Sequence, residues 1–359
     1  MAVSRDAVLK ALEQVIDPEL GRNVVDLDMV REVQIEGGEV AVTIALTVAG
    51  CPLRSSFQDQ VQSAIMPLDD VESVRLAFDV MTPEERSALT ARLRGGVTER
   101  TKGISLDRST RVLAVASGKG GVGKSTLSAN LAVAFDALGK RTGILDADVY
   151  GHSIPHILGV SQKPVLVDRM IVPPVKDGLK LMSIGFFLDD NQPVMWRGPM
   201  LHRALEQFLS DVHWGQLDVL VVDMPPGTGD VAISLGQLLP RAEVIVVTTP
   251  QPAAQEVAAR AAVMAQKTNM RLLGVVENMA GEVFGSGGGE RLAAELGIPL
   301  LGRVPLDPRL REQGDLGEPL VRADPASETA LELSRIAEAV LALERERGIG
   351  IVKPLPVIS

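Results

Sequence analysis

The sequence is poor in cysteine and in aromatic residues. Cys51 is the only cysteine among 359 residues. A single thiol excludes an intramolecular disulfide framework and fits a reducing compartment, so we expect a cytoplasmic protein. Aromatic residues make up 3% of the chain, whereas hydrophobic residues make up 46%. The core therefore has to be built from aliphatic side chains.

Long apolar runs and an excess of positive charge are also missing. No run reaches the roughly 20 apolar residues of a membrane span, and the first ten residues lack the pattern of a signal peptide. The segment 348–359 contains Pro354 and Pro356 and no charge periodicity, which argues against an amphipathic membrane anchor. The formal charge of −10 argues against a large non-specific nucleic-acid surface. We expect neither nucleic acid nor membrane as a partner.

The patterning divides the chain into a small α+β domain (1–93), a linker (94–110), a larger domain (111–346) and a tail (347–359). In the small domain, apolar residues at helical spacing predict helices, and alternating β-branched stretches predict strands. The linker is polar and has little periodicity. The expected helices cover 6–15 and 58–66, and the expected strands cover 40–48 and 71–78.

The larger domain alternates short apolar runs with helical segments. This alternation predicts an α/β fold with a parallel sheet and helices on both faces. Ligands of such a sheet bind at the carboxyl ends of its strands. The expected strands are 112–116, 142–145, 219–222, 244–248, 272–276 and 300–304.

Residues 118–126 contain the phosphate-binding pattern G-x-x-x-x-G-K-[ST] between an expected strand and an expected helix (125–138). Small residues let backbone N–H groups close around phosphate oxygens at a helix N-terminus. Lys124 would reach the β- and γ-phosphates, and the Ser125 hydroxyl would hold Mg²⁺. We therefore expect ATP and Mg²⁺ as cofactors. The expected nucleotide-binding residues of the loop are Gly118, Lys119, Gly120, Gly121, Val122, Gly123, Lys124, Ser125 and Thr126.

Carboxylates follow two further expected strands. Asp146 and Asp148 lie just past one strand end, and Asp223 ends an apolar run in the manner of a Walker B motif. Hydrolysis needs clamped phosphates, neutralised charge and an aligned water, so we expect Asp146 and Asp223 to join Ser125 at Mg²⁺. The expected catalytic residues are Lys119, Lys124 and Asp148. A solvated turn at 146–148 is the alternative.

Asn278 lies at the end of another expected strand, where its side chain could bind the edge of a nucleotide base. Asparagine at a strand end often only caps a turn, so both interpretations stay open. Lys119 raises a different question, because a lysine this early points away from its own loop. A facing subunit is a plausible recipient of its charge.

The loop 119–126 resembles the deviant Walker A motif of ParA/MinD-type ATPases, in which the added lysine reaches the nucleotide of the partner in a closed dimer. Two further stretches resemble the Mrp/ApbC iron–sulfur cluster carriers, namely 196–200 (Trp-Arg-Gly-Pro-Met) and 223–230 (Asp-Met-Pro-Pro-Gly-Thr-Gly-Asp). The N-terminal stretches 17–20 (Asp-Pro-Glu-Leu) and 50–53 (Gly-Cys-Pro-Leu) are similar to the small domain of many bacterial members.

The resemblance implies a homodimer that hydrolyses ATP to ADP and phosphate and passes iron–sulfur clusters to apoproteins or cluster scaffolds. One departure is clear: family members usually place a Cys-x-x-Cys soon after the asparagine that Asn278 matches, whereas residues 280–289 contain no cysteine. Clusters usually need four thiolates, and a homodimer offers two. A dimerisation switch or scaffold without direct cluster binding is the alternative. Cys51 is either a thiol ligand or a small residue packed at a junction.

Overall fold

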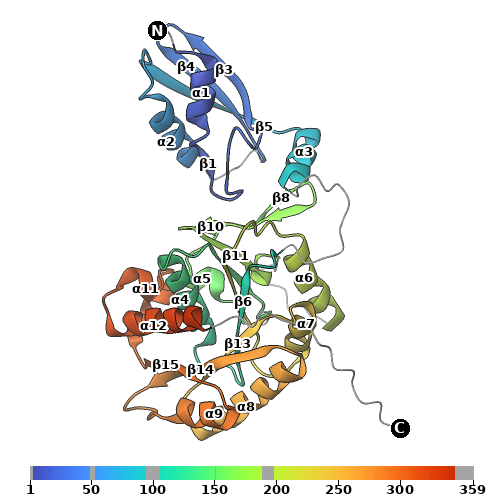
Figure 1. Cartoon of the computed structure of the whole chain (residues 1–359), viewed down its shortest axis with the longest axis vertical. Helices are drawn as coiled ribbons and strands as arrows, with labels where there is room; N and C mark the ends of the chain where they lie inside the picture. The colour runs from blue at the N-terminus through green and yellow to red at the C-terminus, as the bar shows by residue number, and fades with distance from the viewer. Residues whose placement is uncertain (1–2, 49–52, 94–105, 150, 188–197, 344–359) are drawn as a thin grey trace.

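The computed structural model describes residues 3–48, 53–93, 106–149, 151–187 and 198–343 (Figure 1). Cys51, most of the expected linker, residues 344–346 and the expected tail lie outside these ranges, as do Trp196 and Arg197. None of the helices in the described ranges has the length and apolarity that crossing a membrane requires.

The N-terminal unit packs two helices against a three-stranded sheet. Helix α1 begins after Ser4, whose side chain accepts a hydrogen bond from the backbone N–H of Ala7 and so caps the helix. Strand β4 is the middle strand, antiparallel to β3 and parallel to β5. The predicted helices and strands of this unit are confirmed with shifted ends, while β1, β2, β3 and α3 were not predicted. The elements are α1 (Arg5–Leu12), β1 (Ile16–Asp17), β2 (Arg22–Asn23), β3 (Val30–Glu36), β4 (Glu39–Leu46), α2 (Arg54–Ile65), β5 (Ser73–Val80) and α3 (Pro83–Leu93).

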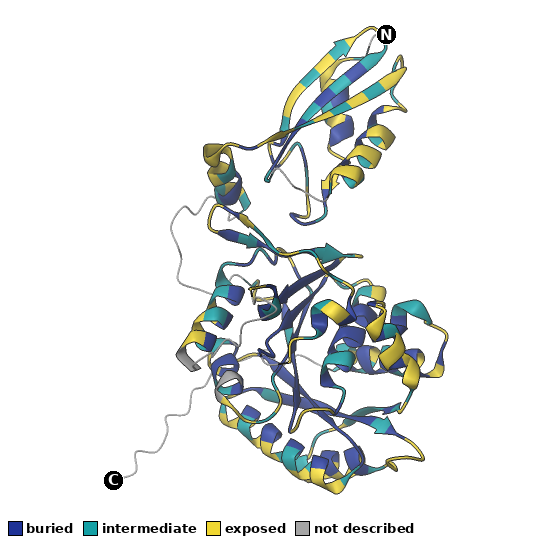
Figure 2. Cartoon of the chain, turned by 180° about the vertical axis from the view of Figure 1, so that it is seen from behind, coloured by how far each residue is buried: buried dark blue, intermediate teal, exposed yellow. Residues whose placement is uncertain are grey.

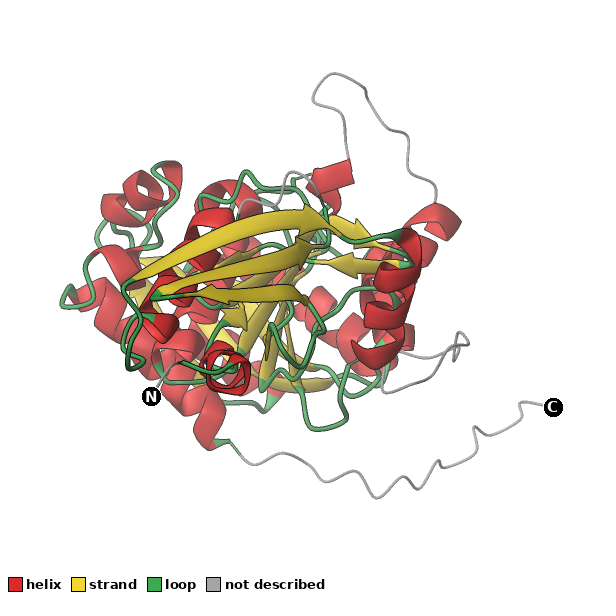
Figure 3. Cartoon of the chain, turned by 90° about the horizontal axis from the view of Figure 1, so that it is seen from above, coloured by secondary structure: helices red, strands yellow, loops and turns green. Residues whose placement is uncertain are grey.

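The larger unit is built on an eight-stranded sheet in the order β10-β11-β7-β12-β6-β13-β14-β15. Figure 3, a view of the chain from above, shows helices on both sides of the strands. All neighbours are parallel except the edge pair β10 and β11. The six predicted strands are confirmed as β6, β7, β12, β13, β14 and β15, and β10 and β11 are additions. The bounds are β6 (Arg111–Ser117), β7 (Thr142–Asp146), β10 (Val175–Lys176), β11 (Leu179–Ser183), β12 (Val219–Asp223), β13 (Glu243–Thr248), β14 (Arg271–Ala280) and β15 (Leu300–Pro305).

Helices cover both faces of this sheet, so its central strands are buried on both sides (Figures 1 and 2). One face carries α4 (Lys124–Ala137), α10 (Pro308–Asp315), α11 (Leu320–Ala323) and α12 (Glu328–Ala342). The other carries α6 (Gly198–Ser210), α7 (Asp230–Leu238), α8 (Pro252–Lys267) and α9 (Gly288–Leu296). Both hydrophobic clusters consist mainly of Val, Leu, Ile and Ala, as the composition predicts. The short helix α5 (Ile154–Ile157) and the 3₁₀ helix η1 (Ile184–Phe187) complete the unit.

A hairpin from the larger part of the chain joins the two units. Strands β8 (Val165–Val167) and β9 (Met170–Val172) contribute buried residues to the hydrophobic cluster of the N-terminal unit. The Thr90 hydroxyl donates a hydrogen bond to the backbone oxygen of Val167 at 3.3 Å. Figure 1 shows β8 directly below α3. The packed core of the N-terminal unit thus extends beyond its own stretch of sequence.

Candidate nucleotide site

The phosphate loop connects the end of β6 at Ser117 to the start of α4 at Lys124. Gly121 and Gly123 have φ angles of 77° and 80°, in the left-handed region that favours glycine. The loop therefore turns sharply and directs the N-terminus of a buried helix at the ligand space. That end of a helix attracts anions, because its first backbone N–H groups lack partners within the helix.

The space around the loop glycines differs from one side to the other. A Cβ atom added to Gly118 would lie 2.2 Å from the backbone carbon of Val257, so α8 packs directly against this part of the loop. A Cβ atom added to Gly120 or Gly121 would meet no atom within 4 Å. The loop is therefore packed against α8 at Gly118 and has open space beside Gly120 and Gly121, as a phosphate-binding loop requires.

Asp223 at the end of β12 contacts the loop lysine and two serines. Its Oδ1 lies 2.9 Å from Lys124 Nζ and accepts a hydrogen bond from Ser128 Oγ at 2.6 Å. Its Oδ2 accepts a hydrogen bond from Ser125 Oγ at 2.6 Å. Asp223 is fully buried, and these contacts satisfy its charge. Ser128 was not among the predicted site residues, although its position one helical turn after Lys124 was a usable signal.

Asp146 lies directly beside Asp223, because the two residues are register partners in parallel strands β7 and β12. Asp146 Oδ2 accepts a hydrogen bond from Ser183 Oγ at 3.0 Å, and Oδ1 accepts one from the backbone N–H of Asp148 at 3.1 Å. Burial, and then the charge of Asp223, raise the pKa of Asp146 to about 7. Ser183 belongs to β11, which the sequence did not predict.

Asp148 also faces the loop lysine. Its Oδ2 lies 3.7 Å from Lys124 Nζ, and its Oδ1 accepts a hydrogen bond from the backbone N–H of Gly151 at 3.1 Å. The turn after β7 is therefore buried and hydrogen-bonded rather than a solvated loop. Asp148 and Asp223 thus both face Lys124 at the carboxyl end of the sheet, with Asp146 beside Asp223.

Lys119 behaves differently from Lys124. Its backbone oxygen accepts a hydrogen bond from Ser117 Oγ at 3.1 Å, while the residue itself is exposed. No ion-pair partner for its ammonium group lies among the described residues. Its charge is thus free to meet a group outside this subunit.

Asn278 contacts the loop from β14. Its Nδ2 donates a hydrogen bond to the backbone oxygen of Val122 at 2.8 Å, whereas its buried Oδ1 finds no hydrogen-bond partner among the described residues. Thr249 Oγ1 and Gln251 Oε1 are also buried, and neither has a partner in the part of the chain that the structure describes. Thr248 is the register partner of Glu277, so Thr249, just past the end of β13, lies beside Asn278 within β14. Thr249 and Gln251 were missed, although polar residues directly after a buried strand could have indicated them.

These features fit ATP and Mg²⁺. Buried polar atoms without partners are costly unless a ligand satisfies them, and a nucleotide base presents a hydrogen-bonding edge. No group of three or more His, Cys, Asp and Glu side chains gathers as a metal centre in the ranges that the structure describes. Mg²⁺ at phosphate sites needs no such cage, since phosphates and waters complete its octahedron. Ser125 and Asp223, in hydrogen-bond contact with each other, suit that role.

The segment after Asn278, where the resemblance implies cysteines, forms a tight turn. Gly281 and Gly285 exchange two backbone hydrogen bonds of 2.9 and 2.7 Å. Buried Glu277 accepts a hydrogen bond from the backbone N–H of Gly287 at 3.0 Å and pairs with Arg303 Nε at 2.9 Å. This segment is therefore a hydrogen-bonded glycine turn without a thiol.

Comparison with known proteins agrees with this geometry. Residues 108–341 match the family model described as NUBPL iron-transfer P-loop NTPase, and residues 5–76 match that of the iron–sulfur cluster assembly proteins. The iron–sulfur cluster carrier protein of Mycobacterium leprae is 49% identical over 358 residues, covering 95% of this chain and 94% of the relative. The carrier protein of Synechocystis is 42% identical over 354 residues, covering 94% and 97%.

Solved structures give the same fold. A nucleotide-binding protein from Archaeoglobus fulgidus in complex with ADP is 36% identical, with a TM-score of 0.53, covering 62% of this chain and 90% of that one. The septum site-determining protein MinD of Pyrococcus horikoshii, complexed with Mg-ADP, is 24% identical and shares the fold with a TM-score of 0.52, covering 64% and 96%. The chain therefore belongs to the Mrp/NUBPL family of iron–sulfur cluster carrier proteins, ParA-type P-loop NTPases with an N-terminal iron–sulfur assembly domain.

Proposed function

We propose that this protein is a homodimeric ATPase that binds or transfers iron–sulfur clusters, with its nucleotides held between the subunits. The observation that carries the proposal is the array in which buried Asp223 contacts both Lys124 and Ser125, while Lys119 on the same loop stays exposed and unpaired within the described residues. Lys124, Ser125 and Asp223 are suited to bind a phosphate and its Mg²⁺. Lys119 is available to contact a nucleotide bound by a second subunit.

Each residue has a defined task in this proposal. The loop N–H groups and Lys124 hold the β- and γ-phosphates, and Ser125 and Asp223 hold Mg²⁺, with Asp146 beside them. When bound, Mg²⁺ neutralises the charge that develops on the phosphates. Asp148, near Lys124, orients the attacking water. Asn278 holds the base through its buried Oδ1.

Phosphate binding requires Lys124 to exchange partners. In this structure its ammonium group lies 2.9 Å from Asp223 Oδ1 and 3.7 Å from Asp148 Oδ2. A bound phosphate would attract Lys124 away from Asp148. Asp148 could then accept a hydrogen bond from water. Lys119 of the second subunit would bring a further positive charge to the γ-phosphate, where charge grows during transfer.

The cluster is cargo rather than a resident group. The relatives from Mycobacterium leprae and Synechocystis are named iron–sulfur cluster carriers, which supports the same task here. A dimer of this chain holds two cysteines, both Cys51, so a cluster between subunits would need ligands from a client or scaffold as well. The glycine turn at 281–285 favours the second candidate, a nucleotide-driven dimerisation switch or scaffold without direct cluster binding.

Iron content separates the two candidates. The wild-type chain and C51S would be reconstituted without oxygen and examined by iron counting and visible absorption. Iron in the wild type that is lost in C51S supports direct carriage through Cys51. Wild-type protein without iron, in a chain that still dimerises with ATP, favours the switch.

A further inference from the structure

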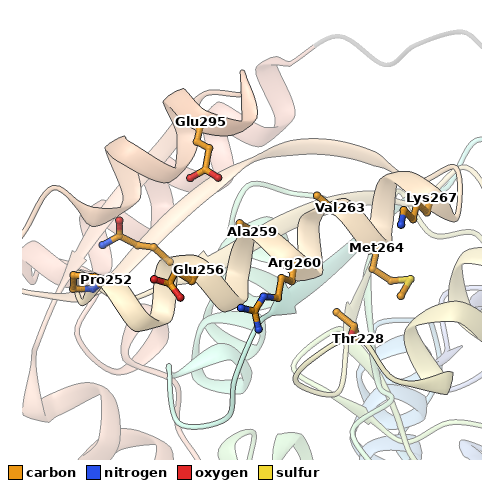
Figure 4. Close-up of a pocket in the computed structure, with 10 residues that line it drawn as sticks. Thr228, Pro252, Glu256, Ala259, Arg260, Val263, Met264, Lys267 and Glu295 are labelled. Atoms are coloured by element: carbon orange, nitrogen blue, oxygen red, sulfur yellow. The ribbon is translucent and has the colours of Figure 1, made fainter.

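The start of the phosphate loop is held by α8 and by the loop after β12. Gly118 packs against the backbone of Val257 on α8, and the backbone N–H of Gly227 donates a hydrogen bond to the backbone oxygen of Ser117 at 2.8 Å. Figure 4 shows Thr228 on that second loop next to α8, and both border an open groove of about 730 Å³. The end of the phosphate loop, directly before α4, has a different support.

Strand β14 supports this end of the loop with two consecutive residues. The Nδ2 of Asn278 donates a hydrogen bond to the backbone oxygen of Val122 at 2.8 Å. A Cβ atom added to Gly123 would overlap Asn278 Nδ2 and would lie 3.4 Å from the Cε of Met279. Consecutive side chains of a regular strand point to opposite faces of the sheet. Here both of them face the same point of the loop, so the strand is irregular at this place.

The irregularity is a β-bulge at the end of β14. Glu277 pairs with Arg303 and Ala280 pairs with Pro305, so two residues of β14 oppose one residue of β15. Bulges are rare between parallel strands, and next to a site they change the direction of a side chain. The second residue of this bulge, Met279, has a φ angle of 58°, in the left-handed region. This left-handed backbone explains why the alternation of the strand is broken.

Methionine is an unusual residue for a left-handed backbone. The other non-glycine residues with positive φ in the described ranges are four aspartates and one asparagine, whose short polar side chains form local hydrogen bonds. Met279 is half-buried and has no such group, whereas glycine would adopt this backbone without strain. The bulge therefore places a large apolar side chain against the phosphate loop at a position where the backbone favours glycine.

The peptide that these two residues contact lies directly before Lys124. A trans peptide points its C=O and its N–H to opposite sides, so the hydrogen bond from Asn278 to the Val122 oxygen directs the Gly123 N–H away from β14. Gly123 is the N-cap residue of α4, and the first N–H groups of a helix are donors for an anion. Rotation of this peptide would turn a carbonyl oxygen toward the phosphate.

We propose that Met279 is a positioning residue for the phosphate loop. Its side chain packs against Gly123 and keeps the 122–123 peptide in the orientation that phosphate binding requires. The flexible thioether side chain maintains this contact as the loop adjusts to a bound nucleotide. This inference rests on the proposed nucleotide site and is independent of the homodimer. Loss of the side chain should therefore weaken nucleotide binding without unfolding the protein.

Three variants separate the side chain from the backbone. M279G removes the side chain and relieves the left-handed backbone, M279A removes the thioether and keeps the strain, and M279L keeps an apolar side chain of similar size. N269G is the matched control, because Asn269 also has a positive φ of 62° but lies in the turn before β14. Titration calorimetry of the full chain with Mg-ADP would measure affinity, and scanning calorimetry without nucleotide would measure the melting temperature.

We expect M279G and M279A to bind Mg-ADP about tenfold more weakly than the wild type, a common effect of losing a residue that supports a binding group. M279L should recover most of the affinity, and N269G should bind as the wild type does. M279G should melt at a higher temperature than M279A, because only M279A keeps the strained backbone. Affinity and stability should therefore change independently.

The contrary outcomes are distinct. If M279G and M279A bind Mg-ADP as tightly as the wild type, Met279 does not position the loop, while the nucleotide site stands. If affinity follows the melting temperature across the three variants, the residue only stabilises the fold and the inference is wrong. Binding by M279L as weak as that of M279A would overturn packing against Gly123 as the cause. A wild type that does not bind Mg-ADP overturns the nucleotide site and this inference together.

Discussion

The molecule buries two groups of charged side chains, and the two groups differ in how closely their charges are paired. At the phosphate site, Lys124 lies 2.9 Å from Asp223, and two serine hydroxyls each donate to that carboxylate at 2.6 Å. Between the two units, Asp17, Glu19 and Lys180 are buried as well. There, Lys180 Nζ donates to the backbone oxygen of His213 at 3.2 Å and forms no ion pair within the described ranges.

The pKa values of Glu19 and Lys180 reflect this weaker pairing. Burial, and then the charge of Asp17, raise the pKa of Glu19 to about 7. Burial lowers the pKa of Lys180 to about 8, although the two carboxylates oppose this shift. The seam between the units thus changes charge near neutral pH. The difference follows the ion pairs: Asp223 has a cation in short contact, whereas Asp146 beside it and Glu19 in the seam have none among the described residues, and the pKa of each of these two is raised to about 7.

The largest effect should come from Lys124. K124A removes the ammonium group that contacts Asp223 and is expected to hold the β- and γ-phosphates, so ATP turnover should fall a hundredfold or more. The measurement is steady-state phosphate release, with K10A on exposed α1 as the control. Turnover within a few-fold of the wild type would show that this charge cluster does not serve phosphate.

Lys119 distinguishes a site within one subunit from a site between two. K119A should lower turnover about ten- to a hundredfold, because the γ-phosphate loses a stabilising charge. Nucleotide binding to the monomer should hardly change, since Lys119 is exposed and contacts no partner in the described residues. Equal loss of monomer binding and turnover would place Lys119 in its own subunit's cradle instead.

Ser128 tests whether short contacts hold Asp223 in position. S128A removes a hydrogen bond to a buried carboxylate, and such bonds contribute about 1.5–3 kcal/mol. We expect kcat to fall about tenfold while KM for ATP changes little. S334A is the matched control. Ser334 Oγ lies 2.9 Å from the backbone oxygen four residues earlier, as Ser128 Oγ lies 3.0 Å from that of Lys124, but Ser334 has no carboxylate partner among the described residues. A rise in KM at constant kcat would contradict a positioning role.

Glu19 tests whether the buried charges between the two units make stability depend on pH. Its pKa rises from 4.5 to about 7 on folding, so the folded chain binds this proton more tightly than the unfolded chain does. Stability is therefore lost as pH rises from about 4.5 to 7, by at most roughly 3 kcal/mol. E19Q removes this penalty.

Scanning calorimetry should thus find E19Q more stable than the wild type at pH 8 and equal to it at pH 4.5. E13Q on the exposed end of α1 should follow the wild type at both values. A lower melting temperature for E19Q at pH 8 would mean that the ionised carboxylate stabilises the seam through Lys180.

The sequence predicted what depends on local pattern and missed what depends on register. The phosphate loop, Asp223 and the six parallel strands each belong to a contiguous stretch with its own signature. Ser183 gains its position beside Asp146 from the pairing of β11 with β7, and no local pattern contains that information. Thr249 directly follows a buried strand, which was a usable signal, but its place beside Asn278 depends on the register of β13 and β14. Strand β11 was not predicted, because Lys180 interrupts its short apolar run. The packing of hairpin β8–β9 on the N-terminal unit was not predicted either, because it brings together segments far apart in the sequence.

Mixing two inactive variants tests the central claim, that each nucleotide is shared by two subunits. K119A and K124A would each be assayed alone and then together with ATP. If Lys119 acts across the dimer, a mixed dimer contains one site with both lysines, and turnover should recover to about a quarter of the wild-type rate. If the mixture is as inactive as its components while mixed dimers form, Lys119 serves its own subunit and the shared site is wrong.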